Sequence, residues 1–161
     1  LLAVVRFVLQ PDDDLSLASL LVSPLLGWTQ DELMHAAVRR STSLWRHLQQ
    51  TQPEERLRPL RHMLNRADFL TPYAFLEDVL SGELDGRRKL LLRLGEEARD
   101  PIEELLNSAL QFETMTTPSL QRFLDWFDRG EVEIKRDPSA PLDAVRVMTA
   151  HAAKGLQAPL V

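Results

Sequence analysis

Apolar residues recur at intervals of three and four along the first 130 residues, which is the spacing of helices that bury one face. The clearest such stripes are Leu33, Met34, Ala37 and Val38; Phe75, Leu76, Val79 and Leu80; Ile102, Leu105, Leu106, Ala109 and Leu110; and Leu120, Phe123, Leu124 and Phe127. Alternating β-branched residues, which are typical of strands, are nearly absent before residue 144. The pattern predicts an all-α fold, an irregular assembly of many helices.

Residues that begin and end helices divide this region into short segments. Helix starts are predicted at one capping box and at three residue–proline pairs: Thr29 with Glu32, Thr71–Pro72, Asp100–Pro101 and Thr117–Pro118. Helix ends are predicted at Gly82, Gly95 and Gly130, with Gly82 as a left-handed cap.

Two further local predictions concern Pro59 and the acidic run Asp12–Asp14. Pro59 lies too far into segment 52–66 for a first helical turn, so we expect the segment, capped by Thr51, to kink or split near Arg58. The acidic run is expected to be a solvated loop, with Asp14 capping the next helix.

The character of the chain changes after residue 130. Residues 131–144 are polar and rich in proline, and are interpreted as a linker. Val145–Thr149 is short, alternating and β-branched, which predicts a strand within the segment 145–161. The chain begins without methionine and stops soon after this strand, so we expect a piece of a longer protein.

Composition limits the class of protein. A chain of 161 residues that is 44% hydrophobic and 27% charged has enough apolar material for one core. No run of 18 apolar residues occurs, so no membrane span is expected. The absence of cysteine excludes disulfides and thiol catalysis, and fits a cytoplasmic location.

Positive charge is concentrated in one segment of an acidic chain. The net charge is −5, yet residues 36–66 hold seven arginines and only two glutamates. This basic run is a candidate contact for duplex DNA, through Arg39, Arg40, Arg58 and Arg61. Alternatively, the arginines form the solvated faces of helices, because arginine is also a good helix former.

Catalytic and metal-binding patterns are absent from the sequence. It has no G-x-x-x-x-G-K-[ST] loop, no H-E-x-x-H pair and no G-x-S-x-G elbow, so no catalysis and no bound metal or cofactor are expected for this chain alone. After the predicted strand, Thr149, His151, Lys154 and Gly155 supply groups that suit phosphate oxygens. An ordinary helical turn ending at Gly155 explains the spacing equally well.

The string V-R-V-M-T-A-H-A-A-K-G-L-Q-A-P-L-V over 145–161 resembles motif V of UvrD/Rep-like superfamily 1 DNA helicases. Four upstream strings resemble the AddA family of helicase–nuclease subunits: D-D-D-L-S-L-A-S-L-L-V-S-P-L-L-G (12–27), E-A-R-D-P-I-E-E-L-L-N (97–107), P-S-L-Q-R-F-L-D-W (118–126) and E-I-K-R-D (133–137). The resemblance therefore extends over most of the chain.

The resemblance implies a domain organisation. Residues 1–130 would be a helical subdomain of the type called 2B, inserted into the second RecA-like motor domain, 2A. Residues 131–144 would be the hinge, and residues 145–161 would re-enter 2A. The strand would thus belong to a RecA-like domain that this chain does not contain.

The resemblance also implies site residues and partners. Thr149 and His151 would lie along single-stranded DNA, with Lys154 beside them shaping the loop, while Gly155 and Gln157 would face the nucleotide. The family usually has glutamate where Gln157 stands, so this contact would lose a charge. ATP and Mg²⁺ would act in the parent protein, and its partners would be DNA and an AddB-like protein.

Two functions follow from these patterns. The first is a DNA-contacting or regulatory segment of an ATP-dependent helicase and nuclease that acts in recombinational double-strand break repair. The alternative is a helical protein–protein interaction module with no nucleic-acid role. An exposed loop at 151–157 and arginines on a common face favour the first, whereas a buried loop and scattered arginines favour the second.

Overall fold

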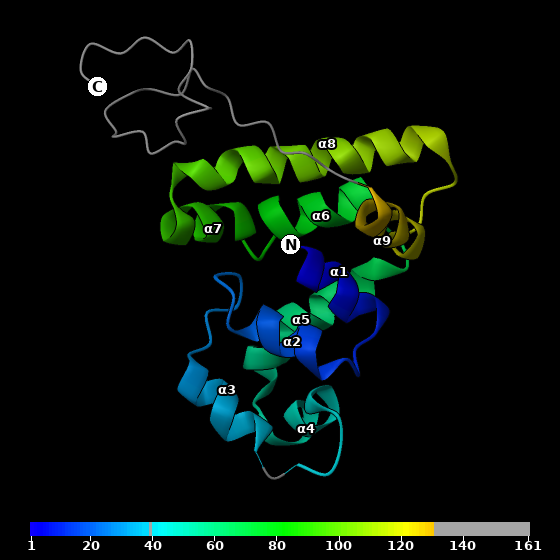
Figure 1. Cartoon of the computed structure of the whole chain (residues 1–161). Helices are drawn as coiled ribbons and strands as arrows, with labels where there is room; N and C mark the ends of the chain where they lie inside the picture. The colour runs from blue at the N-terminus through cyan, green and yellow to red at the C-terminus, as the bar shows by residue number, and fades with distance from the viewer. Residues whose placement is uncertain (39, 131–161) are drawn as a thin grey trace, which may run out of the picture.

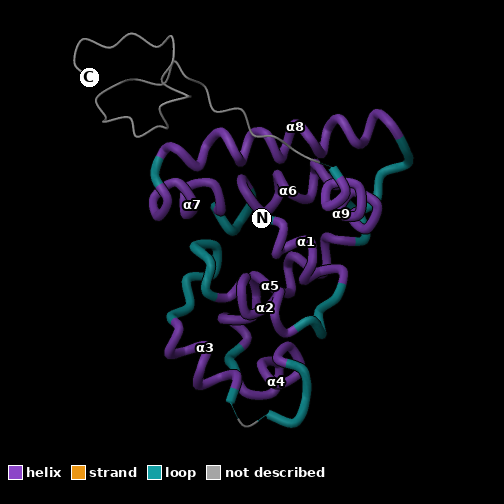
Figure 2. Tube along the Cα trace, viewed as in Figure 1, coloured by secondary structure: helices purple, strands orange, loops and turns teal. Residues whose placement is uncertain are grey.

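A computed structural model describes residues 1–38 and 40–130, and this part of the chain is all-α, as predicted. Helices joined by short loops account for it, and no strand occurs within these residues (Figure 2). The helices are α1 (Leu2–Leu9), α2 (Asp14–Leu21), α3 (Gln30–Ala37), α4 (Leu44–Thr51), α5 (Glu54–Ala67), α6 (Pro72–Ser81), α7 (Gly86–Leu94), the 3₁₀ helix η1 (Glu96–Ala98), α8 (Arg99–Met115) and α9 (Leu120–Arg129). The predicted linker and strand lie outside the described residues.

The helices form two groups around α1. At one end of the molecule α8 runs along α6 and α7, and at the other end α3 and α4 lie together (Figure 1). Between them, α1 packs against α2, α5 and α9, so the start of the chain lies within the body. None of the helices in 1–38 and 40–130 is long and apolar enough to cross a bilayer.

Aromatic and branched side chains fill the core. Val4, Val5 and Phe7 of α1 are fully buried, and the ring of Phe7 meets that of Trp45 edge-on at 5.6 Å between centroids. Phe112 of α8 meets Phe123 of α9 at 5.7 Å in the same manner. Each such side chain contributes roughly 1.5–3 kcal/mol through burial, so these contacts hold α1, α4, α8 and α9 in place.

Helix starts follow the predicted caps at Thr29 and Thr71, whereas α8 begins at Arg99, before the predicted Asp100–Pro101, and has no side-chain cap. Thr29 accepts a hydrogen bond from Glu32 N at 3.1 Å while the Glu32 carboxylate accepts one from Thr29 N at 2.8 Å, which completes the capping box. Thr71 caps α6 through Ala74 N. The last helix starts later than predicted, because the cap of α9 is Ser119, whose hydroxyl accepts from Arg122 N, and Pro118 precedes it.

The expectation that Pro59 splits its segment is wrong, because α5 is continuous over Glu54–Ala67 with Pro59 inside it. Proline removes a single hydrogen bond, to the carbonyl of Glu55, and Glu55 is exposed to water. Burial of Leu57 and Leu60 on either side outweighs this loss. Thr51 does not cap α5 either, because it ends α4 and its hydroxyl donates to the carbonyl of His47 at 2.8 Å.

The prediction of a left-handed cap at Gly82 is wrong, because its φ is −81°, whereas Gly95, which is predicted only to end a helix, has a φ of +86°. The left-handed residue in the turn after Gly82 is Asp85, with φ +53°. Gly82 is required for a different reason, since a Cβ atom there would collide with the carbonyl oxygen of Asp78. A close backbone approach and a left-handed turn both favour glycine, and only the tertiary structure distinguishes them.

We predict that Phe7→Ala costs about 3–5 kcal/mol of unfolding free energy, because it empties a site at the centre of the core. The matched control is Phe69→Ala, since Phe69 is 83% exposed, and its effect should stay within about 0.5 kcal/mol. Urea denaturation followed by circular dichroism measures both. Equal losses for the two variants would contradict the placement of α1.

Candidate nucleic-acid interface

Every described arginine of the basic run lies within ion-pair distance of a carboxylate. The pairs are Arg40 with Asp14, Arg46 with Asp12 (3.1 Å), Arg56 with Glu32, Arg58 with Glu83 (2.8 Å), Arg61 with Glu54 (3.1 Å) and Arg66 with Asp78 (3.9 Å). Arg39 lies outside the described residues. The local positive charge is therefore largely neutralised within the helical body.

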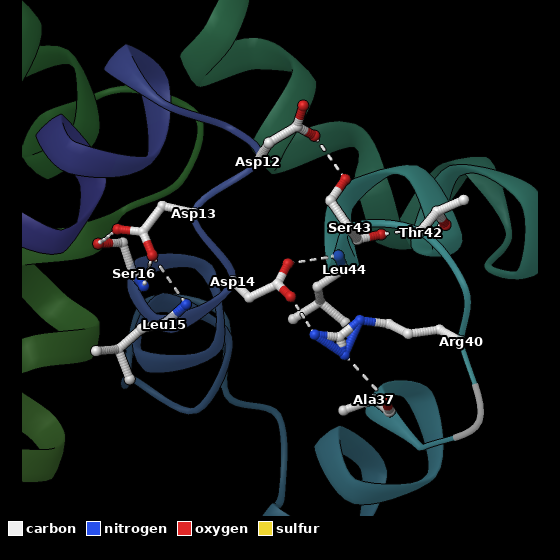
Figure 3. A network of polar contacts seen from close by, with 10 residues as sticks. All are labelled: Asp12, Asp13, Asp14, Leu15, Ser16, Ala37, Arg40, Thr42, Ser43 and Leu44. Atoms are coloured by element: carbon white, nitrogen blue, oxygen red, sulfur yellow. Dashed lines mark hydrogen bonds and ion pairs between the residues drawn. The ribbon is translucent and has the colours of Figure 1, made fainter.

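The acidic run begins α2 and is not a free loop (Figure 3). The side chain of Asp13, and not that of Asp14, caps α2 by accepting from Leu15 N at 3.0 Å and Ser16 N at 3.3 Å. The Ser16 hydroxyl also donates to Asp13 at 2.6 Å. This hydroxyl and the Ser16 amide are the main causes that lower the pKa of Asp13 from its ordinary value of 3.8.

Asp12 and Asp14 reach across to the start of α4 (Figure 3). Leu44 N donates to Asp14 Oδ1 at 2.6 Å, and the Ser43 hydroxyl donates to Asp12 Oδ1 at 2.5 Å. Arg40, whose guanidinium also donates to the carbonyl of Ala37 at 3.0 Å, joins the same network. The expected solvated loop is thus a junction that fastens residues 40–46 to α2. Ser43 makes no cap bond of its own, since α4 is capped from 30 residues away.

Arg56 is held by structural contacts on all sides. Its guanidinium lies 3.9 Å from the ring centroid of Trp28 and pairs with Glu32, which also completes the capping box of α3. The backbone N–H of Thr29, followed by Arg56, lowers the pKa of Glu32 below its ordinary value of 4.5. These contacts assign Arg56 to packing between the α2–α3 loop and α5.

The predicted DNA contacts fall into two separate places. Arg40 and Arg46 face the acidic run at the start of α2. Arg58 and Arg61 lie one turn apart on α5, and Arg58 pairs with Glu83 in the turn between α6 and α7. Exposed pairs of this kind contribute at most about 1 kcal/mol, so phosphate can displace them. Each described arginine would have to exchange a carboxylate for the phosphate.

A cleft of about 460 Å³ lies beside Arg58, between α5 and the α6–α7 segment. His62 Nε2 approaches Asp78 Oδ2 at 2.8 Å on its wall, and Glu55, Glu83 and Lys89 also line it. Three carboxylates (Glu55, Asp78, Glu83) outnumber the two permanent cations (Arg58, Lys89) in its lining, so it does not select for anions. Over residues 1–38 and 40–130 no three His, Asp or Glu side chains are placed to hold a metal ion.

The motif V residues, namely Thr149, His151, Lys154, Gly155 and Gln157, lie outside the described residues, as does the predicted strand. Their contacts with DNA and nucleotide therefore stay predictions. The Asp12–Asp14 junction was missed by the sequence reasoning. Three consecutive aspartates before a helix indicate that one of them caps it. The neighbouring sequence does not indicate which distant groups the other two carboxylates contact.

We predict that Asp14→Ala costs about 1–2 kcal/mol, because it removes charge-assisted hydrogen bonds to Leu44 N and Arg40 at a partly exposed site. Hydrogen exchange at the Leu44 amide should accelerate at the same time. Asp31→Ala is the control, since no side-chain hydrogen bond or ion pair of Asp31 occurs in the described part. Unchanged exchange at Leu44 would refute the junction.

Comparison with known proteins finds that this chain is similar to segments of ATP-dependent helicases. It is 26% identical over 172 aligned residues to the AddA polypeptide of the ATP-dependent helicase/nuclease of Lactobacillus helveticus and to its counterpart from Lactobacillus acidophilus, and 97% of the chain is covered in each case. It is 27% identical over 183 aligned residues, covering 100% of the chain, to "ATP-dependent DNA helicase PcrA" of Bacillus subtilis.

The matched part is a fraction of each relative. The chain spans 14% of the length of the two lactobacillar proteins and 25% of the B. subtilis protein. No protein-family profile matches the chain, and no solved structure matches it. Nearly the whole chain is similar to one segment of UvrD-like helicases, which confirms the resemblance that its motifs predict.

Proposed function

We propose that this chain is the 2B-type helical insertion of an ATP-dependent DNA helicase and nuclease, followed by its return into the motor domain. The observation that carries the proposal is that nearly the whole chain is similar to one segment of ATP-dependent helicases, and the packing of the first described helix on the last is consistent with an insertion. The helices α1 and α9 pack together (Figure 1). Leu1 and Gly130 line the same hollow, and Arg6 pairs with Asp128 at 2.9 Å. A body with adjacent ends can be inserted into a loop of another domain without disturbing it.

Within this proposal, residues 131–144 serve as a hinge and residues 145–161 carry motif V. Thr149, His151 and Lys154 contact single-stranded DNA, and Gly155 and Gln157 face the nucleotide between the motor domains. ATP hydrolysis with Mg²⁺ and nuclease activity then belong to the remainder of the parent, whose partner is an AddB-like protein. The role is recombinational double-strand break repair in the bacterial cytoplasm.

A contact of the basic run with duplex DNA is the second part of the proposal, and the ion pairs limit its strength. Phosphate has to replace a carboxylate at Arg40, Arg58 and Arg61, so the helical body binds duplex weakly and only at low salt. The motor domains provide most of the binding affinity for DNA, and the helical body orients the duplex.

The alternative function is a helical protein-interaction module. The neutralised arginines favour it, since they leave little free positive charge for phosphate at residues 40–66. Similarity to helicases along nearly the whole chain favours the insertion, and the packing of α1 on α9 is consistent with it.

We predict that His151→Ala or Lys154→Ala in the full-length parent reduces ATP-driven unwinding by at least about tenfold, which corresponds to roughly 1.4 kcal/mol of lost stabilisation. Arg88→Ala, at an exposed position of α7, is the control and should unwind normally. A fluorescent strand-displacement assay measures the rate, and circular dichroism of the 161-residue protein checks that the helices persist. Normal unwinding by both motif variants would remove the motif V assignment.

We predict that the 161-residue protein binds a forked duplex weakly, and that neutralising Arg39, Arg40, Arg58 and Arg61 to glutamine abolishes the binding. Glu83→Gln should tighten binding severalfold, because it releases Arg58 from its carboxylate. Arg88→Gln and Arg99→Gln, at ion-paired arginines elsewhere, are the controls.

Fluorescence anisotropy at low and moderate ionic strength measures these affinities. Loss of duplex binding in the control variants, or no duplex binding at any salt concentration, would contradict the duplex contact. The hinge role of residues 131–144 would then be the part of the proposal that stands.

A further inference from the structure

The last turn of α7 exposes leucine side chains to water. Leu92 is 74% exposed and Leu94 is 57% exposed, whereas Leu90 on the inner face of the same helix is buried. Gly95, with φ +86°, ends the helix immediately after them. Large apolar side chains grouped in this way on a surface mark an interaction site more often than an isolated exposed leucine does.

Two hollows lie on either side of this turn. One, of about 820 Å³, is lined by Val22, Pro24, Trp28, Leu92 and Leu94. The other, of about 790 Å³, is the hollow lined by Leu1 and Gly130, and its lining also includes Leu90, Ile102 and Phe127. Leu94 lines both, so the two hollows and the turn between them form one apolar tract, which we call the α7 tract.

The first hollow carries free positive charge. Lys89 and Arg93 line it, and no carboxylate lies within ion-pair distance of either in residues 1–38 and 40–130. Lys89 Nζ donates to the carbonyl of Leu25 at 3.1 Å. The other arginines of α7 differ, because Arg87 pairs with Glu77 and Glu103, and Arg88 pairs with Asp85. Lys89 and Arg93, which make no ion pair in the described part, thus line the apolar hollow, and Lys89 also lines the cleft beside Arg58.

We propose that the α7 tract binds an acidic amphipathic helix, supplied by another protein or domain. Its apolar stripe would cover Leu92 and Leu94, and its carboxylates would meet Lys89 and Arg93. Nucleic acid fits this surface less well, because phosphates gain nothing from exposed leucines and need several cations in a row. The proposal does not depend on a role in DNA repair, since it uses only the described helices.

The test uses the 161-residue protein and a labelled synthetic helix of about 16 residues, with leucines at helical spacing and glutamates elsewhere. The same helix with lysine in place of glutamate is the control probe. Fluorescence anisotropy should show binding of the glutamate helix that weakens with salt, and at least about tenfold weaker binding of the lysine helix. The double variant Leu92→Asp, Arg93→Glu should weaken binding of the glutamate helix by at least about tenfold.

Leu15→Asp is the matched control variant, because Leu15 is 78% exposed and lines neither hollow, and it should keep its affinity within about twofold. Circular dichroism checks that each variant is folded. Three results would overturn the proposal: no binding of the glutamate helix up to about 1 mM, equal affinity for both helices, or equal loss in Leu15→Asp. A forked duplex serves as a third probe, and duplex binding lost in Arg93→Glu without binding of the glutamate helix would reassign the tract to nucleic acid.

Discussion

Burial of α1 is the constraint on which the rest of the arrangement depends. A helix whose Val4, Val5 and Phe7 are all removed from water must be enclosed by other elements, and α2, α5 and α9 enclose it. Because α9 is the last described helix and α1 is the first, this packing places residues 2–9 beside residues 120–129. Burying a short apolar helix therefore determines which distant parts of the chain lie side by side.

The fold also determines which charged side chains pair with one another. The basic run looks like a nucleic-acid surface in the sequence, yet its described arginines meet carboxylates from α2, the α6–α7 turn and their own helix. These pairs fasten peripheral segments, most clearly where Asp12 and Asp14 hold the loop before α4. At these arginines another anion can bind only by replacing a carboxylate. The apolar α7 tract, with Lys89 and Arg93 at its edge, suits a protein contact.

Carboxylates from distant positions in the sequence also cap the N-termini of helices. Asp14 accepts from Leu44 N at the start of α4, and Glu113 of α8 accepts from Tyr73 N at the start of α6 at 2.8 Å. A helix N-terminus has free N–H groups and a partial positive charge, so a carboxylate from any part of the chain stabilises it. Each of these contacts ties a helix start to another helix, which joins local capping to tertiary packing.

The sequence by itself determined the helical class, most helix boundaries and the resemblance to UvrD-like helicases, because spacing, capping boxes and short motifs are local properties. The capping box at Thr29 and the helix end at Gly95 were predictable for this reason. Only the tertiary structure decided that α5 continues through Pro59, that Gly82 is required by a close backbone approach, and that Arg40, Arg58 and Arg61 are neutralised. The physical reason is that burial and ion pairing depend on which distant residues come together. The helical spacing of apolar residues does not indicate which other helix a given face will contact.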